Sequence, residues 1–477
     1  MMSAPRSPGL SRRPRNFSGA LSIPLKFLGL RDRPGERGAL IIKAGLTMYD
    51  QFTRGFQMTP AHTMHSRAQA LAERPGLNPD IVRTATYYDA WMPYPERICI
   101  ELIADAETLT ERARAVNYLS AIDGDGDSVT LLDELTGEQY TVQPKVVINA
   151  AGPWIDFVNR AMNQPTRFIG GTKGSHLVLD HPELHALCKG HELFFENKDG
   201  RITLFFPLMD KVLVGTTDIR IDNPDEAICT EDEVDYMLNL INVVFPHLPV
   251  DRSHIVFRFC GVRPLPNSEA ATAGQISRDH SIRTLEPGDS LNYPVLSLIG
   301  GKWTTFRAFS EQATDEALAR LGLKRKHNTR EMPIGGGRDY PKNSTDRRAL
   351  LHQIEIETGL DHTRIETLFA RYGTRAREVA AFLAAAPDAP LAHHPGYSQR
   401  EIIYLTQTEQ VAHIDDLLLR RALIGMLGEL TPALLHEIAA IIGSTLGWDD
   451  ARREAEIARV VNLWQTRHSI DLSPATA

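Results

Sequence analysis

Residues 295–306, VLSLIGGKWTTF, combine a predicted strand, a pair of glycines and the start of a predicted helix. The apolar and small residues at 295–299 are typical of a short buried strand. Gly300 and Gly301 end that strand, and the apolar side chains of residues 305–321 recur with helical spacing. A strand, a glycine turn and a helix in this order predict an α/β domain whose turn approaches a ligand closely.

The same mixture of strands and helices extends toward the N-terminus. Residues 202–207 and 212–216 predict a β-hairpin, with Met209 and Asp210 at its turn. Residues 231–244 predict a helix. Beyond residue 333 the pattern changes, and helical spacing dominates in residues 350–357, 364–372, 375–385, 415–427 and 451–464.

Composition divides the 477-residue chain into four parts. Residues 1–22 form a basic leader that we expect to be disordered. Residues 23–333 hold the mixed α/β domain, and residues 334–344, with three consecutive glycines, predict a linker. Residues 345–470 predict an all-α domain, so the chain contains two folded domains.

Charge and cysteine spacing exclude several classes of function. Lysine and arginine number 52 against 60 aspartates and glutamates, a net charge of −8. This balance argues against a nucleic-acid-binding protein, which should be basic. An anionic small substrate stays compatible with it, because a basic pocket can lie within an acidic protein. None of the four cysteines shows metal-ligand spacing, so we predict neither a metal site nor a disulfide framework.

Two cationic side chains stand beside sharp backbone features. Lys302 follows the glycine turn, where the free amides of a helix start add to its positive charge. Arg263 lies in the stretch CGVRPL, is held extended by Pro264, and needs an anionic partner if it is buried. The alternatives are a surface lysine on a plain turn and an internal salt bridge.

Three further segments place polar or small side chains next to strands. In GTKGSHLVL, Lys173 and His176 stand at the start of a strand, and an imidazole can exchange a proton near neutral pH. The segment VGTTD contains Thr217, and the segment INAAGPW allows a flat ligand to approach. A structural histidine, an Asx turn and a plain helix start are the alternatives.

Taken together and in this order, the five segments resemble the FAD-dependent glycerol-3-phosphate dehydrogenase family, the respiratory kind that passes electrons to a quinone. The matching motifs are NAAGPW (149–154), KGSH (173–176), GTTD (215–218), GVRPL (261–265) and GGKWTTF (300–306). The resemblance implies an α/β flavoprotein fold of the glutathione-reductase or D-amino-acid-oxidase type in residues 23–333, N-terminally incomplete. The all-α domain resembles the C-terminal domain of that family.

The resemblance also implies an activity, the oxidation of sn-glycerol 3-phosphate to dihydroxyacetone phosphate by hydride transfer from carbon 2 to FAD. His176 would accept the proton of the 2-hydroxyl, while Arg263 and Lys302 bind the phosphate and the developing oxyanion. The residues implied to bind substrate are Lys173, Thr217, Arg263 and Lys302. Those implied to bind the cofactor are Asn149, Ala150, Gly152, Gly300, Gly301, Lys302 and Thr304.

One motif of the family is missing from the sequence. Family members have a strand and a GxGxxG turn that bind the FAD pyrophosphate, whereas Gly124 and Gly126 here are not followed by the third glycine. Without that βαβ unit, the strands ending at Asn149 and Ile299 would expose their edges. We therefore expect this chain to bind FAD weakly and to have little activity.

The same resemblance gives meaning to residues 23–56, because the family is held on the membrane surface without spanning it. This stretch interleaves apolar residues with Lys26, Arg31 and Lys43, and it includes a helical pattern at 39–52. Such a stretch suits anionic headgroups, and an ordinary surface helix and loop is the alternative. We expect a cytoplasmic protein, peripheral on the inner face of the membrane, that forms a homodimer.

Two other functions stay open at the level of sequence. The chain could be an amine-oxidising flavin oxidase of related fold, in which Arg263 would bind a carboxylate. It could also be a truncated, non-catalytic pseudoenzyme that docks on membranes or on a full-length relative. The missing glycine motif favours the second alternative, and the lysine-containing motifs argue against the first.

Overall fold

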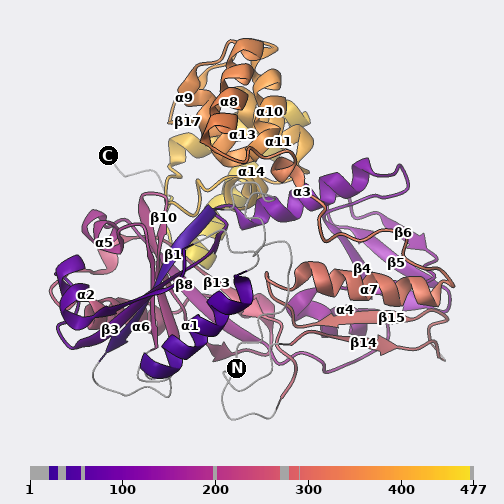
Figure 1. Cartoon of the computed structure of the whole chain (residues 1–477). Helices are drawn as coiled ribbons and strands as arrows, with labels where there is room; N and C mark the ends of the chain where they lie inside the picture. Colours follow the sequence, from indigo (N-terminus) through magenta and orange to yellow (C-terminus); the bar gives the residue numbers. More distant parts are fainter. Residues whose placement is uncertain are drawn as a thin grey trace.

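The computed structural model describes residues 21–30, 39–54, 60–196, 201–268, 279–288 and 290–472. Figure 1 shows three parts, a large sheet on the left, a smaller α/β part on the right, and a helical region above both. The fold is thus mixed α/β with a helical C-terminal region, as the sequence predicts. No helix in these ranges combines the length and apolarity that crossing a bilayer requires.

The large sheet has nine strands. Its order is β12-β8-β11-β10-β9-β1-β3-β2, and β13 pairs with β8 off this path. The strands are β1 (Leu21–Leu30), β2 (Thr63–Ser66), β3 (Ile81–Trp91), β8 (Thr172–Leu179), β9 (Glu192–Glu196), β10 (Ile202–Leu208), β11 (Lys211–Gly215), β12 (Ile219–Arg220) and β13 (Ile255–Arg263). The accompanying helices are α1 (Ala39–Thr53), α2 (Arg67–Glu73), α5 (Pro182–Cys188) and α6 (Glu231–Val244).

One face of this sheet packs on α6. Apolar residues of α6 recur at helical spacing, and Val234, Met237 and Ile241 are fully buried against Leu177 and Val214 of the sheet. Thr230 caps the helix, and its capping box with Glu233 fixes where α6 begins. This packing places the start of α6 next to the first residues of β8 and the residues that follow β11.

The smaller α/β part contains two three-stranded sheets. One has the order β14-β15-β7, with β14 (Ser281–Leu285), β15 (Val295–Ile299) and β7 (Val147–Asn149). The other has the order β4-β5-β6, with β4 (Leu119–Asp125), β5 (Ser128–Asp133) and β6 (Gln139–Val142). The helices here are α3 (Pro95–Thr108), α4 (Ile155–Ala161) and α7 (Phe306–Arg320), and a 3-10 turn, η2 (Gly152–Trp154), follows β7.

The edge of the β14-β15-β7 sheet differs from the prediction in one respect. We expected both the strand ending at Asn149 and the strand ending at Ile299 to be exposed at an edge. The structure pairs β15 with β14 on one side and with β7 on the other, so β15 is an inner strand. Among the described strands, only β15 pairs with β7, and Ile148 of β7 is 46% exposed.

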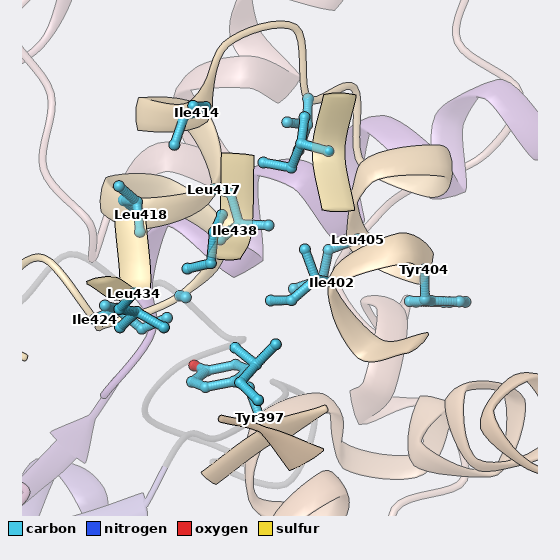
Figure 2. Close-up of a cluster of buried hydrophobic side chains, with 14 of the residues drawn as sticks. Tyr397, Ile402, Tyr404, Leu405, Ile414, Leu417, Leu418, Ile424, Leu434 and Ile438 are labelled. Carbon is cyan, nitrogen blue, oxygen red and sulfur yellow. The ribbon is translucent and has the colours of Figure 1, made fainter. Parts of the chain in front are cut away.

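The helical region contains α8 (Ser344–Thr358), α9 (His362–Tyr372), α10 (Ala376–Ala384), α11 (Gln399–Thr408), α12 (Ile414–Asp416), α13 (Pro432–Leu446), α14 (Asp450–Leu463) and a short hairpin, β16 (Pro390–Leu391) with β17 (His394–Ser398). The apolar core between these elements continues onto Val178 and Phe257 of the large sheet. Figure 2 shows side chains of this core pointing toward one another, including Tyr397, Ile402, Leu417 and Ile438.

Residues 23–30 do not form the loop or helix that we considered for the membrane-facing stretch. They belong to β1, which pairs antiparallel with β3 and parallel with β9. Because its backbone is hydrogen-bonded on both sides, β1 is an inner strand of the large sheet. The remainder of that stretch contains α1, which matches the predicted helix.

The three glycines at 335–337, which we predicted to be part of a linker, form a buried 3-10 turn. The amide of Gly336 donates to Oε2 of Glu101 on α3 at 3.1 Å. Gly335 has a φ of 43°, and a Cβ there would overlap the Glu101 carboxylate. This segment is therefore a fixed joint and not a free spacer.

A second joint ties α3 to the helical region. Both terminal nitrogens of Arg97 donate to the Glu409 carboxylate, at 2.7 and 3.1 Å. Both side chains are buried, and a bidentate pair of this kind fixes the two groups in orientation as well as distance. The Tyr118 hydroxyl adds a bond to Asp416 at 2.8 Å.

Candidate functional site

Arg263 is the last residue of β13, where it lies opposite Thr172 of β8. Its Nη1 donates to Asp218 Oδ1 at 3.3 Å, and its Nη2 donates to Thr216 Oγ1 at 3.2 Å. Both nitrogens also approach the Thr217 carbonyl oxygen at 3.4 Å. The guanidinium passes over Gly174, where a Cβ would overlap it. The loop after β11 therefore orients the positive charge of Arg263.

His176 lies on β8 between Gly215 of β11 and Phe259 of β13. Its ring stacks on Phe259 with centroids 5.1 Å apart and planes 13° from parallel. A Cβ at Gly215 would overlap the imidazole, so the glycine makes room for it. Burial, with a smaller effect from the charge of Arg263, lowers the pKa of His176 to about 4.

The imidazole is consequently neutral at physiological pH. Its Nδ1 is buried and has no hydrogen-bond partner among the described residues. A neutral ring beside a guanidinium can accept a hydrogen bond or a proton from a bound hydroxyl.

Lys173 and Thr217 lie behind this pair, inside the protein. The Lys173 Nζ donates to Glu233 Oε2 and to the Ile228 carbonyl, each at 2.7 Å. The Thr217 hydroxyl donates to Glu233 Oε1 at 2.6 Å. Both side chains are buried, and their polar atoms point to Glu233. This placement favours a role in holding the site over a direct contact with substrate.

The glycine turn after β15 joins the strand to α7 as predicted. Gly300 and Gly301 have φ values of 76° and 114°, which favour glycine. The amide of Lys302 donates to Thr305 Oγ1 at 3.1 Å, which closes the turn before α7. The Lys302 side chain is exposed, as is Thr304. In the described part of the chain, the Lys302 ammonium makes no hydrogen bond or ion pair.

The turn after β7 lies beside that turn. β7 and β15 are parallel, and Asn149 lies opposite Ser297, so both turns leave the same edge of the sheet. Asn149 is buried and donates to the Ile155 carbonyl and to Asn159, which fixes the start of α4. Gly152 has a φ of 60°, and a Cβ there would meet only open space.

The two turns leave exposed backbone at the same sheet edge, which is where a flavin ring would have to lie. Their exposed positions, Ala150, Gly301 and Thr304, leave backbone accessible at the carboxyl ends of adjacent parallel strands, where open α/β sheets bind ligands. The residues present fit the ring portion of a flavin. The turns after β7 and β15 do not contain the GxGxxG pattern that binds a pyrophosphate.

The predicted site residues therefore form two groups. Lys173, His176, Thr217 and Arg263 lie together on the large sheet, whereas the residues at 149–152 and 300–304 lie at the edge of the smaller one. The two sheets are tied together close to Arg263, because Ile169 bridges Pro266 and both oxygens of Asp156 on α4 accept backbone amides of residues 168 and 169. Among the described residues, no hydrogen bond links the side chain of Lys302 with the group around Arg263.

Sequence reasoning missed Glu233 and Phe259. Glu233 gave a local signal, because Thr230 followed three residues later by glutamate is a capping box. That signal predicts a helix start and nothing about the site. Phe259 gave no signal, since its contact with His176 depends on the register between β13 and β8.

Comparison with known proteins identifies the family. Residues 36–290 match the model of the FAD dependent oxidoreductase family, and residues 327–453 match that of the C-terminal domain of alpha-glycerophosphate oxidase. A glycerol-3-phosphate dehydrogenase of Synechocystis sp. is 30% identical over 453 residues, covering 88% of this chain and 77% of the relative. An aerobic glycerol-3-phosphate dehydrogenase of Staphylococcus haemolyticus is 28% identical, covering 86% and 75%.

A solved structure shows the same fold. The glycerol-3-phosphate dehydrogenase of Bacillus halodurans, in complex with FAD, superposes with a TM-score of 0.74 at 18% identity, covering 97% of this chain and 85% of that one. The two matched models, the relatives and this fold agree with one another. The chain therefore belongs to the FAD-dependent oxidoreductase family, among the glycerol-3-phosphate dehydrogenases.

Proposed function

We propose that this protein oxidises sn-glycerol 3-phosphate to dihydroxyacetone phosphate and passes the electrons to a quinone. FAD, when bound, supplies the acceptor for the hydride that leaves carbon 2 of the substrate. The observation that carries the proposal is the pair formed by Arg263 and the neutral imidazole of His176 on neighbouring strands. A phosphorylated alcohol needs both groups, a cation for the phosphate and a proton acceptor for the hydroxyl.

Arg263 and Lys302 bind the phosphate in this proposal. A guanidinium offers paired donors that match phosphate oxygens, and its contacts with Thr216 and Asp218 orient it before substrate arrives. Lys302 adds an exposed charge on the turn that precedes α7. Lys173 and Thr217 support Arg263 from behind.

His176 accepts the proton of the 2-hydroxyl. Its low pKa keeps it neutral, and part of that lowering comes from the charge of Arg263. A phosphate dianion bound to Arg263 offsets this charge and raises the pKa of His176. The imidazole thus becomes a stronger base only when substrate is bound, which is when the proton must be removed.

The turns at 149–152 and 300–304 hold the flavin ring in this proposal. Asn149 shapes the first turn, Ala150 and Gly152 would hold the ring there, and Gly300, Gly301, Lys302 and Thr304 would hold it at the second turn. Their support is the shared sheet edge and the open space beside Gly152. Weak retention of FAD by this chain stays a prediction, measured by flavin absorbance after incubation with FAD and gel filtration.

Membrane contact is the second part of the proposal, since a quinone dissolves in the bilayer. Helix α1 offers the surface, because Ile41, Met48 and Phe52 share one face of it and are 60%, 64% and 54% exposed. Leu40, which is 83% exposed, borders this face, whereas the exposed Lys43 lies on the opposite side of the helix, two residues after Ile41. An exposed apolar face with a cationic side chain on the polar side of the helix is typical of helices that lie in a lipid surface.

Anaerobic reduction of the bound flavin tests the chemistry. We expect sn-glycerol 3-phosphate to bleach the flavin absorbance of the FAD-incubated chain, and sarcosine to leave it unchanged. Bleaching by sarcosine alone would favour the amine-oxidising alternative. A chain that binds glycerol 3-phosphate but never retains flavin would favour the non-catalytic one.

A further inference from the structure

Glu233 is buried at the start of α6 and accepts hydrogen bonds through both of its carboxylate oxygens. Its Oε1 accepts from the hydroxyls of Thr217 and Ser175, at 2.6 and 2.9 Å. Its Oε2 accepts from the Lys173 ammonium at 2.7 Å and from the Thr230 amide at 2.9 Å. The side chain is 3% exposed. These bonds lower the pKa of Glu233 against the effect of burial, so the carboxylate is charged.

The network leads directly to the substrate-facing arginine. The Thr217 hydroxyl is held from two sides, since it donates to Glu233 and accepts from the Ser175 amide at 2.9 Å. The carbonyl of the same residue accepts from both terminal nitrogens of Arg263. Because the side chain of Thr217 is held in place, its carbonyl cannot rotate freely. The position of Glu233 therefore determines where the Thr217 carbonyl oxygen lies, and this oxygen accepts from the Arg263 guanidinium.

Burial makes this arrangement rigid. Water does not compete with bonds at such a site, and a buried charge that loses its partner is costly. Lys173 and Glu233 form a buried ion pair, so the ammonium of Lys173 stays inside the protein and does not face the substrate. The network therefore holds one geometry.

We propose that Glu233 is a positioning residue, which acts through Thr217 to fix Arg263 in the orientation that binds the substrate phosphate. Lys173 is its internal counter-ion and does not touch substrate. This inference rests on the proposed oxidation of sn-glycerol 3-phosphate. It predicts that the link from Glu233 through Thr217 to Arg263 affects substrate affinity beyond its effect on folding, whereas the bond from Ser175 to Glu233 affects folding alone.

Thr217→Val is the informative variant, because it keeps the shape of the side chain and removes only the hydroxyl that links Glu233 to Arg263. Ser175→Ala is the matched control, since it removes a bond to the same carboxylate oxygen without touching Arg263. Thr217→Ser restores the hydroxyl. Glu233→Gln completes the set, and Thr217→Val keeps the test decisive if that variant fails to fold.

The dissociation constant of sn-glycerol 3-phosphate is measured calorimetrically on the full chain without added FAD, alongside the melting temperature, and KM and kcat are measured with FAD. We expect Thr217→Val to raise the dissociation constant and KM about tenfold with a smaller change in kcat, as loss of one buried bond would. Ser175→Ala and Thr217→Ser should stay within about twofold of the wild type.

Equal dissociation constants for Thr217→Val and Ser175→Ala, with similar losses in melting temperature, would show that the network is only structural and would overturn the inference about Glu233. A wild-type chain that neither binds nor oxidises sn-glycerol 3-phosphate would instead overturn the proposed function, and the inference with it. The two failures are therefore distinguishable.

Discussion

Gly174 and Gly215 decide how closely the two central side chains of the site approach the sheet. A Cβ at Gly174 would overlap the Arg263 guanidinium, and a Cβ at Gly215 would overlap the His176 ring. Arg263 and His176 therefore pack directly against the backbone of Gly174 and Gly215, where any larger residue would displace them. Arg263 and His176 are close enough for the arginine charge to lower the pKa of the histidine.

The pH dependence of catalysis reports on His176 directly. The neutral imidazole is the proton acceptor, so kcat/KM, which reports the free enzyme, is lost as pH falls through the pKa of His176 in the free protein, which lies near 4 and not near the usual 6.5. We expect His176→Ala to lower kcat/KM by about 10²-fold or more. The ratio of wild-type to variant kcat/KM, which cancels the titration of the substrate phosphate, should stay constant from about pH 8 to about pH 5.

A ratio that falls by half near the ordinary histidine pKa would contradict this prediction. It would mean that His176 is solvated as in a free peptide. A ratio near unity at every pH would mean that another group takes the proton.

Sequence could predict residue types at the site but not what each side chain contacts. His176, Arg263 and Lys302 are recognisable beside their glycines. Lys173 looks equally suited to an anionic substrate, yet its ammonium pairs with Glu233, 60 residues away in the chain. Such a long-range pairing has no local signature, because it depends on how α6 packs against β8.

Among the helices and strands, the predicted hairpin and the predicted helix at 231–244, which depend on local sequence patterns, are confirmed. The β10–β11 hairpin turns at Met209 and Asp210, and α6 begins and ends at the predicted residues. The helix predicted at 415–427 is wrong beyond its first turns, since α12 gives way to a π-helical turn at 417–421 and then to irregular backbone. Gly428, with a φ of 70°, lies against Val256, so packing against the sheet overrides the helical pattern here.

Helix α1 is the element that we predict to contact the membrane through its exposed apolar face. Ile41→Ser combined with Met48→Ser should weaken co-sedimentation with vesicles containing anionic lipid, because it removes apolar area from the exposed face. Wild-type binding should also fall at high salt. The matched control is Ile356→Ser on α8, whose side chain is 72% exposed. Equal sedimentation of all three proteins would remove α1 as the contact.

At the scale of the whole molecule, the site is divided between two sheets. Arg263 ends β13 of the large sheet, whereas Lys302 follows β15 of the smaller one, and Figure 1 shows β13 and β15 in these separate parts. The bridge at Ile169 and the contacts of Asp156 hold the two parts in fixed relation. The proposed chemistry therefore requires one ligand to reach across from one sheet to the other.

Arg263 and Lys302 bind the same phosphate in the proposed site. The KM of sn-glycerol 3-phosphate, measured in Arg263→Ala, Lys302→Ala and the double variant, shows whether they do. Each single change should raise KM about tenfold or more, and the double variant should raise it by less than the product, because two cations on one dianion are coupled. Lys326→Ala, an exposed lysine on the segment after α7, should leave KM unchanged. Independent effects that multiply in the double variant, or an unchanged KM in Lys302→Ala, would contradict the account.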